Sequence, residues 1–152
     1  MDIEEYLERH GVWHRFTPKR ETVHTADASE ATGIELHRIT KNLVSVTDTG
    51  EHAVLVVAGD RRVDLRLAAD ALGVGNVRLM PFREAEAVSG YPPGATPSLG
   101  FRAPVRVVVD RELTEFETIF CGGGARDRLL EVRVEDVIRF NDAVVAPISR
   151  AG

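Results

Sequence analysis

The stretch KNLVSVTDTGEHAVLVVAG, from Lys41 to Gly59, decides the fold of this chain. Two apolar runs, Lys41–Thr47 and His52–Ala58, flank a turn signal at Asp48, Thr49 and Gly50. This pattern is typical of two strands that are joined by a short turn. The second run is apolar without alternation, as expected for a strand that is covered on both faces. We therefore predict that His52–Ala58 lies at the centre of a sheet.

The rest of the chain alternates helical and extended patterns around this pair. Helices are predicted at Asp2–His10, Leu65–Leu72, Arg83–Ser89 and Glu135–Phe140. A further short helix is predicted to be capped by Asp27 with Glu30 and to end near Gly33 and Ile34. Strands are predicted at Val105–Asp110, Glu115–Cys121 and Leu129–Val132, with an extended piece at Val12–Phe16. This order predicts one compact domain over residues 1–152, of class α+β or α/β, with a mixed, partly barrel-like β-sheet flanked by short helices.

Composition fits a globular protein that needs no covalent staple. The chain has 152 residues, 43% of them hydrophobic and 28% charged, and a chain of this length buries about 70% of its unfolded surface. No apolar run approaches the roughly 20 residues that span a bilayer, and the acidic start MDIEEYLERH is unlike a signal peptide. A single cysteine, Cys121, excludes an intramolecular disulfide. We expect a cytoplasmic protein that does not contact a membrane.

The net charge of −5 argues against a large nucleic-acid footprint, because phosphate contacts require Lys and Arg. DNA is therefore not expected as a partner. Basic residues nevertheless occur in local groups, which either converge on one face that touches the end of an RNA or are scattered charges that aid solubility. The groups are Lys19 with Arg20, Arg61 with Arg62 and Arg66, Arg102 with Arg106, and Arg126 with Arg128.

The segment GYPPGATPSLG, Gly90–Gly100, contains three of the seven prolines and three of the thirteen glycines. Prolines fix φ and remove backbone donors, whereas glycines let a ligand approach the peptide groups. The segment is either a rigid connection between two elements or a wall of a binding site that is built from backbone. A second glycine-rich segment, CGGG, runs from Cys121 to Gly124.

Lys41 stands where a helical pattern meets an apolar strand. Its neighbours Ile39, Leu43 and Val44 belong to a core, and an unpaired buried charge is costly. The ammonium must therefore reach the edge of the sheet or a cleft, or lie in solvent at the end of a buried stem.

These features, in this order, resemble the YbaK/prolyl-tRNA synthetase-associated domain family, which includes free-standing aminoacyl-tRNA deacylases. The resemblance covers nearly the whole chain, with TVHTADASEATGIELHRITKNLV before the Gly/Pro segment and RVEDVIRF after it. Its most specific element is His24, the short helix with Ala28 and Ala31, and the lysine of KNLV. The Gly-Tyr-x-x-Gly segment that closes on Gly100 comes next.

The resemblance implies a hydrolase that deacylates mischarged aminoacyl-tRNA, with a small amino acid on tRNA for proline or a related tRNA. It implies Lys41 as the catalytic cation, the acceptor end of tRNA as partner, and a synthetase as a further candidate partner. Family members usually read Ser-Pro where this chain reads Pro97-Ser98, which leaves the amino acid open. The substrate-binding residues that it implies are His24, Gly90, Tyr91, Gly94, Pro97, Ser98, Gly100, Gly122, Gly123 and Gly124.

Other catalytic patterns are missing. The sequence has no Gly-x-Ser-x-Gly, no His-Glu-x-x-His, no Walker motif and no Gly-x-Gly-x-x-Gly after a strand. Gly11 lies between His10 and His14 and interrupts the helical pattern, so we do not expect the two imidazoles to share a helical face that binds a metal. We predict that no metal or other cofactor is needed and that Cys121 is structural.

Two other functions remain open at this point. The chain could bind the 3′ end of aminoacyl-tRNA or a nucleotide without turnover, or it could use the same pocket to contact a synthetase. The enzyme requires that Lys41, Gly94, Gly100 and Gly123 surround one pocket, and the sequence predicts this arrangement.

Overall fold

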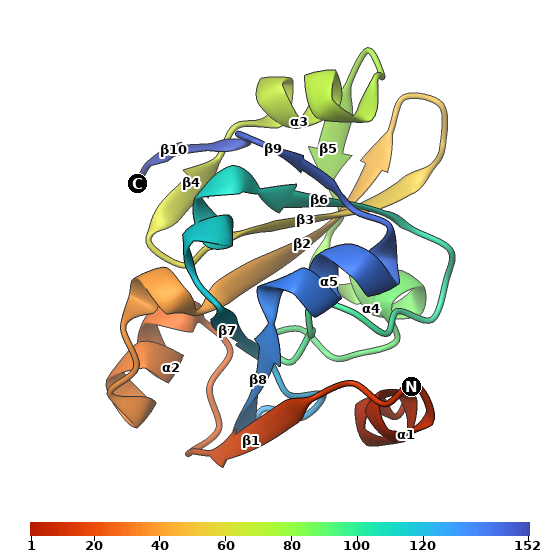
Figure 1. Cartoon of the computed structure of the whole chain (residues 1–152). Helices are drawn as coiled ribbons and strands as arrows, with labels where there is room; N and C mark the ends of the chain where they lie inside the picture. Colours follow the sequence, from red (N-terminus) through yellow and green to blue (C-terminus); the bar gives the residue numbers. More distant parts are fainter.

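The computed structural model describes residues 1–152, and its strands form three sheets (Figure 1). A five-stranded mixed sheet has the order β5-β2-β3-β6-β9, a three-stranded antiparallel sheet has the order β1-β8-β7, and β10 pairs with β4. The strands are β1 (His14–Pro18), β2 (Thr40–Thr47), β3 (His52–Ala58), β4 (Arg61–Val63), β5 (Val77–Leu79), β6 (Arg106–Asp110), β7 (Thr118–Gly122), β8 (Arg128–Arg133), β9 (Val144–Ala146) and β10 (Ser149–Ala151).

The predicted central strand is confirmed. Strand β3 pairs antiparallel with β2 and parallel with β6, and every residue from Ala53 to Ala58 is fully buried. A strand in this position contacts other elements on both faces, which explains its continuous apolar sequence.

Each face of the five-stranded sheet has its own apolar core. Ala53, Leu55 and Val57 of β3 pack under helix α3 (Leu65–Leu72), whereas Val54 and Val56 face the three-stranded sheet. Figure 1 shows α3 above the sheet and β1, β7 and β8 below it. The remaining helices are α1 (Ile3–Arg9), α2 (Thr25–Thr32), α4 (Phe82–Ser89), α5 (Val134–Asn141) and the 3₁₀ turns η1 (Leu36–Arg38) and η2 (Arg111–Glu115).

The two larger sheets meet at a parallel bridge between Ile39, which precedes β2, and Phe120 of β7. The bridge turns the strand surface around the interior, so that the sheets wrap a common core. The α+β class with a mixed, partly barrel-like sheet is therefore confirmed.

Two predicted boundaries are wrong for identifiable reasons. Helix α2 begins at Thr25 after His24, so Asp27 is not its cap but lies in its first turn. A carboxylate there stabilises the helix through a favourable interaction with the helix dipole. The predicted strand Glu115–Cys121 begins at Thr118, because the 3₁₀ turn η2 occupies the chain as far as Glu115. None of the helices combines the length and the apolar character that crossing a membrane requires.

Candidate functional site

A cavity of about 240 Å³ opens beside β2, between α2 and α4. Its roof is Ile39–Val44, and its floor includes Gly94 and Thr96 of the Gly/Pro segment together with Gly122 at the end of β7. On the α4 side, the lining residues Phe82, Ala85, Glu86 and Ser89 follow helical spacing along one face of the helix. Segments that lie far apart in the sequence therefore share one pocket.

The floor is backbone packed on backbone. A Cβ built on Gly122 would lie 2.3 Å from the carbonyl carbon of Ala95 and 2.5 Å from the nitrogen of Thr96. Gly122 N–H donates to the Thr96 carbonyl at 3.1 Å. Gly94 has a φ of +85° and would meet the backbone of Val23 at 2.6 Å if it carried a Cβ. Only glycine allows both approaches.

Tyr91 closes the Gly/Pro segment on itself. Its hydroxyl donates to the Gly100 carbonyl at 2.5 Å, and its backbone N–H donates to Ser89 Oγ at 3.1 Å. The residue is 1% exposed, and burial raises the pKa of the phenol above its ordinary value. The ring therefore fixes the ends of the segment, and the phenol stays protonated.

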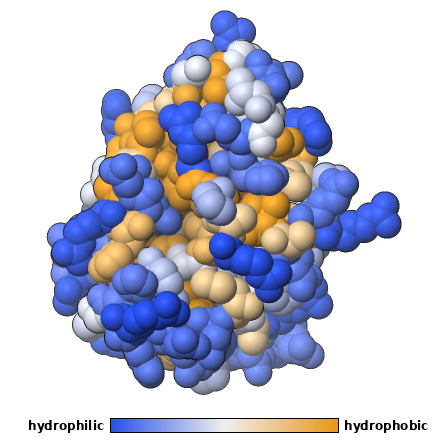
Figure 2. Space-filling model, turned by 90° about the vertical axis from the view of Figure 1, so that its right-hand side faces the viewer, coloured by the Kyte–Doolittle hydropathy of each residue, from blue (hydrophilic) through white to orange (hydrophobic).

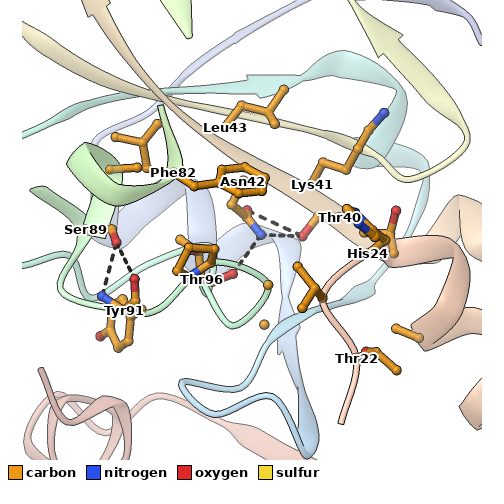
Figure 3. A pocket seen from close by; sticks show the side chains of 18 of the residues that line it. Thr22, His24, Thr40, Lys41, Asn42, Leu43, Phe82, Ser89, Tyr91 and Thr96 are labelled. Atoms are coloured by element: carbon orange, nitrogen blue, oxygen red, sulfur yellow. Dashed lines mark hydrogen bonds between the residues drawn. The ribbon is translucent and has the colours of Figure 1, made fainter. Parts of the chain in front are cut away.

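Sequence reasoning missed Asn42, which ties β2 to this segment (Figure 3). Its Nδ2 donates to the Thr96 carbonyl at 3.0 Å, and its Oδ1 accepts from Ser98 Oγ at 2.6 Å. Thr40 Oγ1 lies 3.1 Å from both Asn42 Nδ2 and Ser98 Oγ. The alternation of polar Thr40 and Asn42 in an apolar strand was the available signal, because period 2 places both on one face.

The edge of β2 is free along the cavity. Strand β5 pairs only with Ser45–Thr47, and the Val44 carbonyl accepts from Met80 N–H at 2.9 Å. Backbone groups of alternate residues point to the same side of a strand, so those of Asn42 also point away from β3. In the floor, the N–H groups of Gly94 and Thr96 have no hydrogen-bond acceptor within the protein. Both residues line the cavity, which makes their N–H groups candidate donors to a ligand.

Lys41 lines the cavity at the roof, but its side chain lies on the other face of β2 from Thr40 and Asn42. Its Nζ donates to the carbonyl of Arg61, and Figure 3 shows the side chain pointing away from Thr96. Burial lowers the pKa of Lys41 below its ordinary value, and the charge of Asp60 partly opposes this effect. The ammonium therefore sits beside the pocket rather than in it.

One of the basic groups adjoins the cavity. Lys19 Nζ donates to Thr22 Oγ1 at 2.7 Å and to the carbonyl of Arg126, and burial lowers the pKa of this lysine. Arg126 Nε in turn donates to the Pro93 carbonyl at 2.8 Å. Exposed His24 stands at the mouth, where it precedes α2.

The expectation that Lys41, Gly94, Gly100 and Gly123 surround one pocket is wrong for Gly100 and Gly123, and it holds for Lys41 only in part, because the residue lines the roof while its ammonium points away. A Cβ on Gly100 would meet Ile3 at 2.9 Å, and one on Gly123 would meet Arg128 at 2.7 Å, so both pack elsewhere. The structure brings part of the predicted set together around the cavity, and the remainder lies outside it. The predicted residues that line the cavity are His24, Lys41, Tyr91, Gly94 and Gly122. The predicted residues that lie outside it are Gly90, Pro97, Ser98, Gly100, Gly123 and Gly124.

Cys121 has no exposed surface, and burial raises the pKa of its thiol to about 12. A neutral buried thiol is a poor nucleophile. No group of three or more His, Cys, Asp or Glu side chains is arranged to hold a metal ion.

Comparison with known proteins gives a consistent result. The aminoacyl-tRNA editing domain matches residues 19–140. A protein of Enterococcus faecalis named "Putative Cys-tRNA(Pro)/Cys-tRNA(Cys) deacylase EbsC" is 25% identical over 146 residues, which cover 94% of this chain and 89% of that protein. A proline-tRNA ligase of Cupriavidus necator is 30% identical over 124 residues, but these are 74% of this chain and only 22% of the ligase.

Solved structures share the fold. The crystal structure of "hypothetical protein APE2540" has a TM-score of 0.90 and 28% identity, and covers 97% of this chain and 99% of that one. A structure described as "a putative trans-editing enzyme for prolyl tRNA synthetase" has a TM-score of 0.83 at 24% identity, covering 98% and 95% of the two chains. The latter likeness concerns the fold alone.

Proposed function

The chain belongs to the aminoacyl-tRNA editing domain family, and we propose that it hydrolyses the ester of mischarged aminoacyl-tRNA in the cavity beside β2. The observation that carries the proposal is the pair of residues Gly94 and Thr96, which line the cavity and whose backbone N–H groups have no acceptor in the protein. Such donors stabilise the oxyanion that forms when water attacks an ester.

The reaction needs little more from the protein. Water adds to the ester carbonyl carbon, the bond to the ribose oxygen breaks, and that oxygen takes a proton, so that the products are free amino acid and tRNA. The neighbouring ribose hydroxyl can help to position the water, because the substrate holds it close to the ester. Each preorganised backbone donor contributes on the order of 10²–10³ in rate.

Lys41 supplies the positive charge in this proposal. Its stem starts at the free edge of β2, so rotation about the side chain can carry the ammonium from the Arg61 carbonyl around the edge toward the bound ester or terminal phosphate. A lysine suits this movement because its four-carbon stem is flexible.

We propose a small amino acid, such as alanine or cysteine, on tRNA for proline or a related tRNA. The small cavity and the names of the similar proteins support this class. Synthetases discriminate one methylene or hydroxyl by only about 1–3 kcal/mol, so a second hydrolytic site has a purpose. One domain over residues 1–152 would act on these tRNAs in the cytoplasm, without a metal and with a synthetase as an optional partner.

The test is release of amino acid from tRNA for proline that is charged in turn with alanine, cysteine and proline. We expect release of a small noncognate amino acid and retention of proline. Binding of charged tRNA without release of any amino acid would instead support the binding-module alternative.

A further inference from the structure

Exposed apolar side chains concentrate at the mouth of the cavity. Five large hydrophobic residues of the chain are exposed, and three of them line this one cavity: Val23 at 39%, Leu79 at 41% and Phe82 at 62% exposed. Figure 2 shows one face of the molecule, turned by 90° from Figure 1, on which apolar surface lies between hydrophilic side chains. Grouped exposed apolar residues mark binding surfaces more often than single ones do.

Phe82 is the most exposed of these residues and is held on a rigid element. It is the first residue of α4, directly after Pro81, whose φ of −58° suits a helix start. The same helix face continues into the cavity through Ala85 and Ser89. In Figure 3, Phe82 stands on the α4 side of the pocket and His24 on the opposite side. The backbone of Phe82 is thus held at the start of a helix, and the ring is presented to solvent.

The size of the cavity indicates what remains outside it. Pockets that enclose a drug-sized ligand usually measure about 300–1,000 Å³, and this one is about 240 Å³. An amino acid and its ribose would fill a space of this size, which would leave the terminal adenine of the tRNA at the mouth, beside the exposed apolar rim.

We propose that Phe82 is the platform on which the terminal adenine base of the aminoacyl-tRNA stacks. The inference rests on the proposed function, since it takes the ester to lie in the cavity. Every base offers a π face to an aromatic ring, and stacking of this kind needs no hydrogen-bond partner. An exposed phenyl ring without a packing role is suited to it.

Charged side chains of both signs lie near Phe82 along the chain. Arg78 and Arg83 are exposed and lie within four residues of Phe82 along the chain. Neither guanidinium forms an ion pair with a carboxylate of the protein. Exposed Glu84 and Glu86 are equally near, and Glu86 lines the cavity, so the segment carries no net positive charge and the proposal rests on the exposed ring.

The experiment uses the whole chain and a short RNA ending in CCA, with 2-aminopurine in place of the terminal adenine. Fluorescence of this base falls when it stacks. We expect quenching with the wild type and with Phe82→Tyr, and a dissociation constant roughly five- to a hundredfold higher for Phe82→Leu. The Leu variant keeps an apolar side chain, so it separates stacking from simple apolar contact. Leu67→Ala, at a 37% exposed site on α3, is the matched surface control and should bind like the wild type.

Deacylation kinetics give a second readout. Phe82→Leu should raise KM by a similar factor and leave kcat unchanged, because the ring does not touch the ester. The ratio of the KM of Phe82→Leu to that of the wild type should stay constant as the salt concentration increases, whereas the effect of losing a phosphate contact would depend on salt. Equal binding of the probe by wild type and Phe82→Leu would overturn the inference. Absence of turnover in the wild type would count against the proposed function alone, since the fluorescent probe reports binding without hydrolysis.

Discussion

Replacing Gly122 by alanine tests whether the cavity floor must be bare backbone. The added methyl group would lie 2.3 Å from Ala95 and 2.5 Å from Thr96, whereas ordinary contacts begin at 3.4 Å. The two segments must therefore separate by about 1 Å. The movement would strain the hydrogen bond from Gly122 N–H to the Thr96 carbonyl, and the bond from Asn42 Nδ2 to the same oxygen.

The cost follows from this displacement. Overpacking of a buried contact typically destabilises by about 1–3 kcal/mol, which corresponds to a fall in Tm of roughly 2–12 °C for a chain of this size. Misplacement of catalytic groups by about 1 Å lowers rates by about 100-fold. We therefore expect Gly122→Ala to lose far more activity than stability.

The assay is the single-turnover rate of deacylation, measured beside thermal unfolding. Gly50→Ala is the matched control, because Gly50 has a φ of +87° in the β2–β3 turn and a Cβ there would touch nothing. That variant should lose about 1–2 kcal/mol through backbone strain alone and keep its rate. A Gly122→Ala protein as active as the wild type would refute a role for the backbone floor.

Two further predictions concern titratable side chains. Cys121→Ala should keep its deacylation rate within about twofold of the wild type, with and without a chelator. It should lose about 1–2 kcal/mol of stability, because removal of the thiol leaves a small cavity. A much lower rate in this variant would point to Cys121 as a nucleophile. Asp60 accepts from His37 at 2.7 Å and raises the pKa of that imidazole above its ordinary 6.5. The contribution of this pair to folding stability is therefore complete below about pH 6.5, and it is lost as pH rises through the higher pKa that His37 has in the folded state. In urea unfolding, His37→Gln should cost up to about 1 kcal/mol near pH 5.5 and less near pH 8.5; an equal cost at both pH values would contradict the pairing.

The long elements could be predicted because their patterns are local. Strand β3 and helix α3 have the predicted bounds, since a continuous apolar run and an Asp64 cap with Gly73 at the end are legible without tertiary context. The three-residue strands were missed. Strand β4, with the sequence RRV, has no strand signal of its own and is defined by its pairing with β10.

The site was predictable in outline for the same reason. The composition of Gly90–Gly100 left a rigid connection and a backbone wall both open, and the sequence could not show that Gly94 lines the cavity while Gly100 packs on Ile3. The direction of the Lys41 side chain depends on the register of β2 with β3, which a single sequence does not reveal. Asn42 was overlooked because its partners, Thr96 and Ser98, lie more than fifty positions away.

The charge of Lys41 is the central claim, and Lys41→Met tests it most directly because methionine keeps an apolar stem. The measurement is the single-turnover rate at saturating enzyme on the mischarged tRNA that the wild type hydrolyses fastest. Arg62→Met, at an exposed position of β4, controls for loss of one positive charge. We predict a fall of at least about 100-fold for Lys41→Met, a normal rate for Arg62→Met, and a stability loss near 1 kcal/mol from the missing bond to the Arg61 carbonyl. A Lys41→Met protein that deacylates at the wild-type rate would contradict the account.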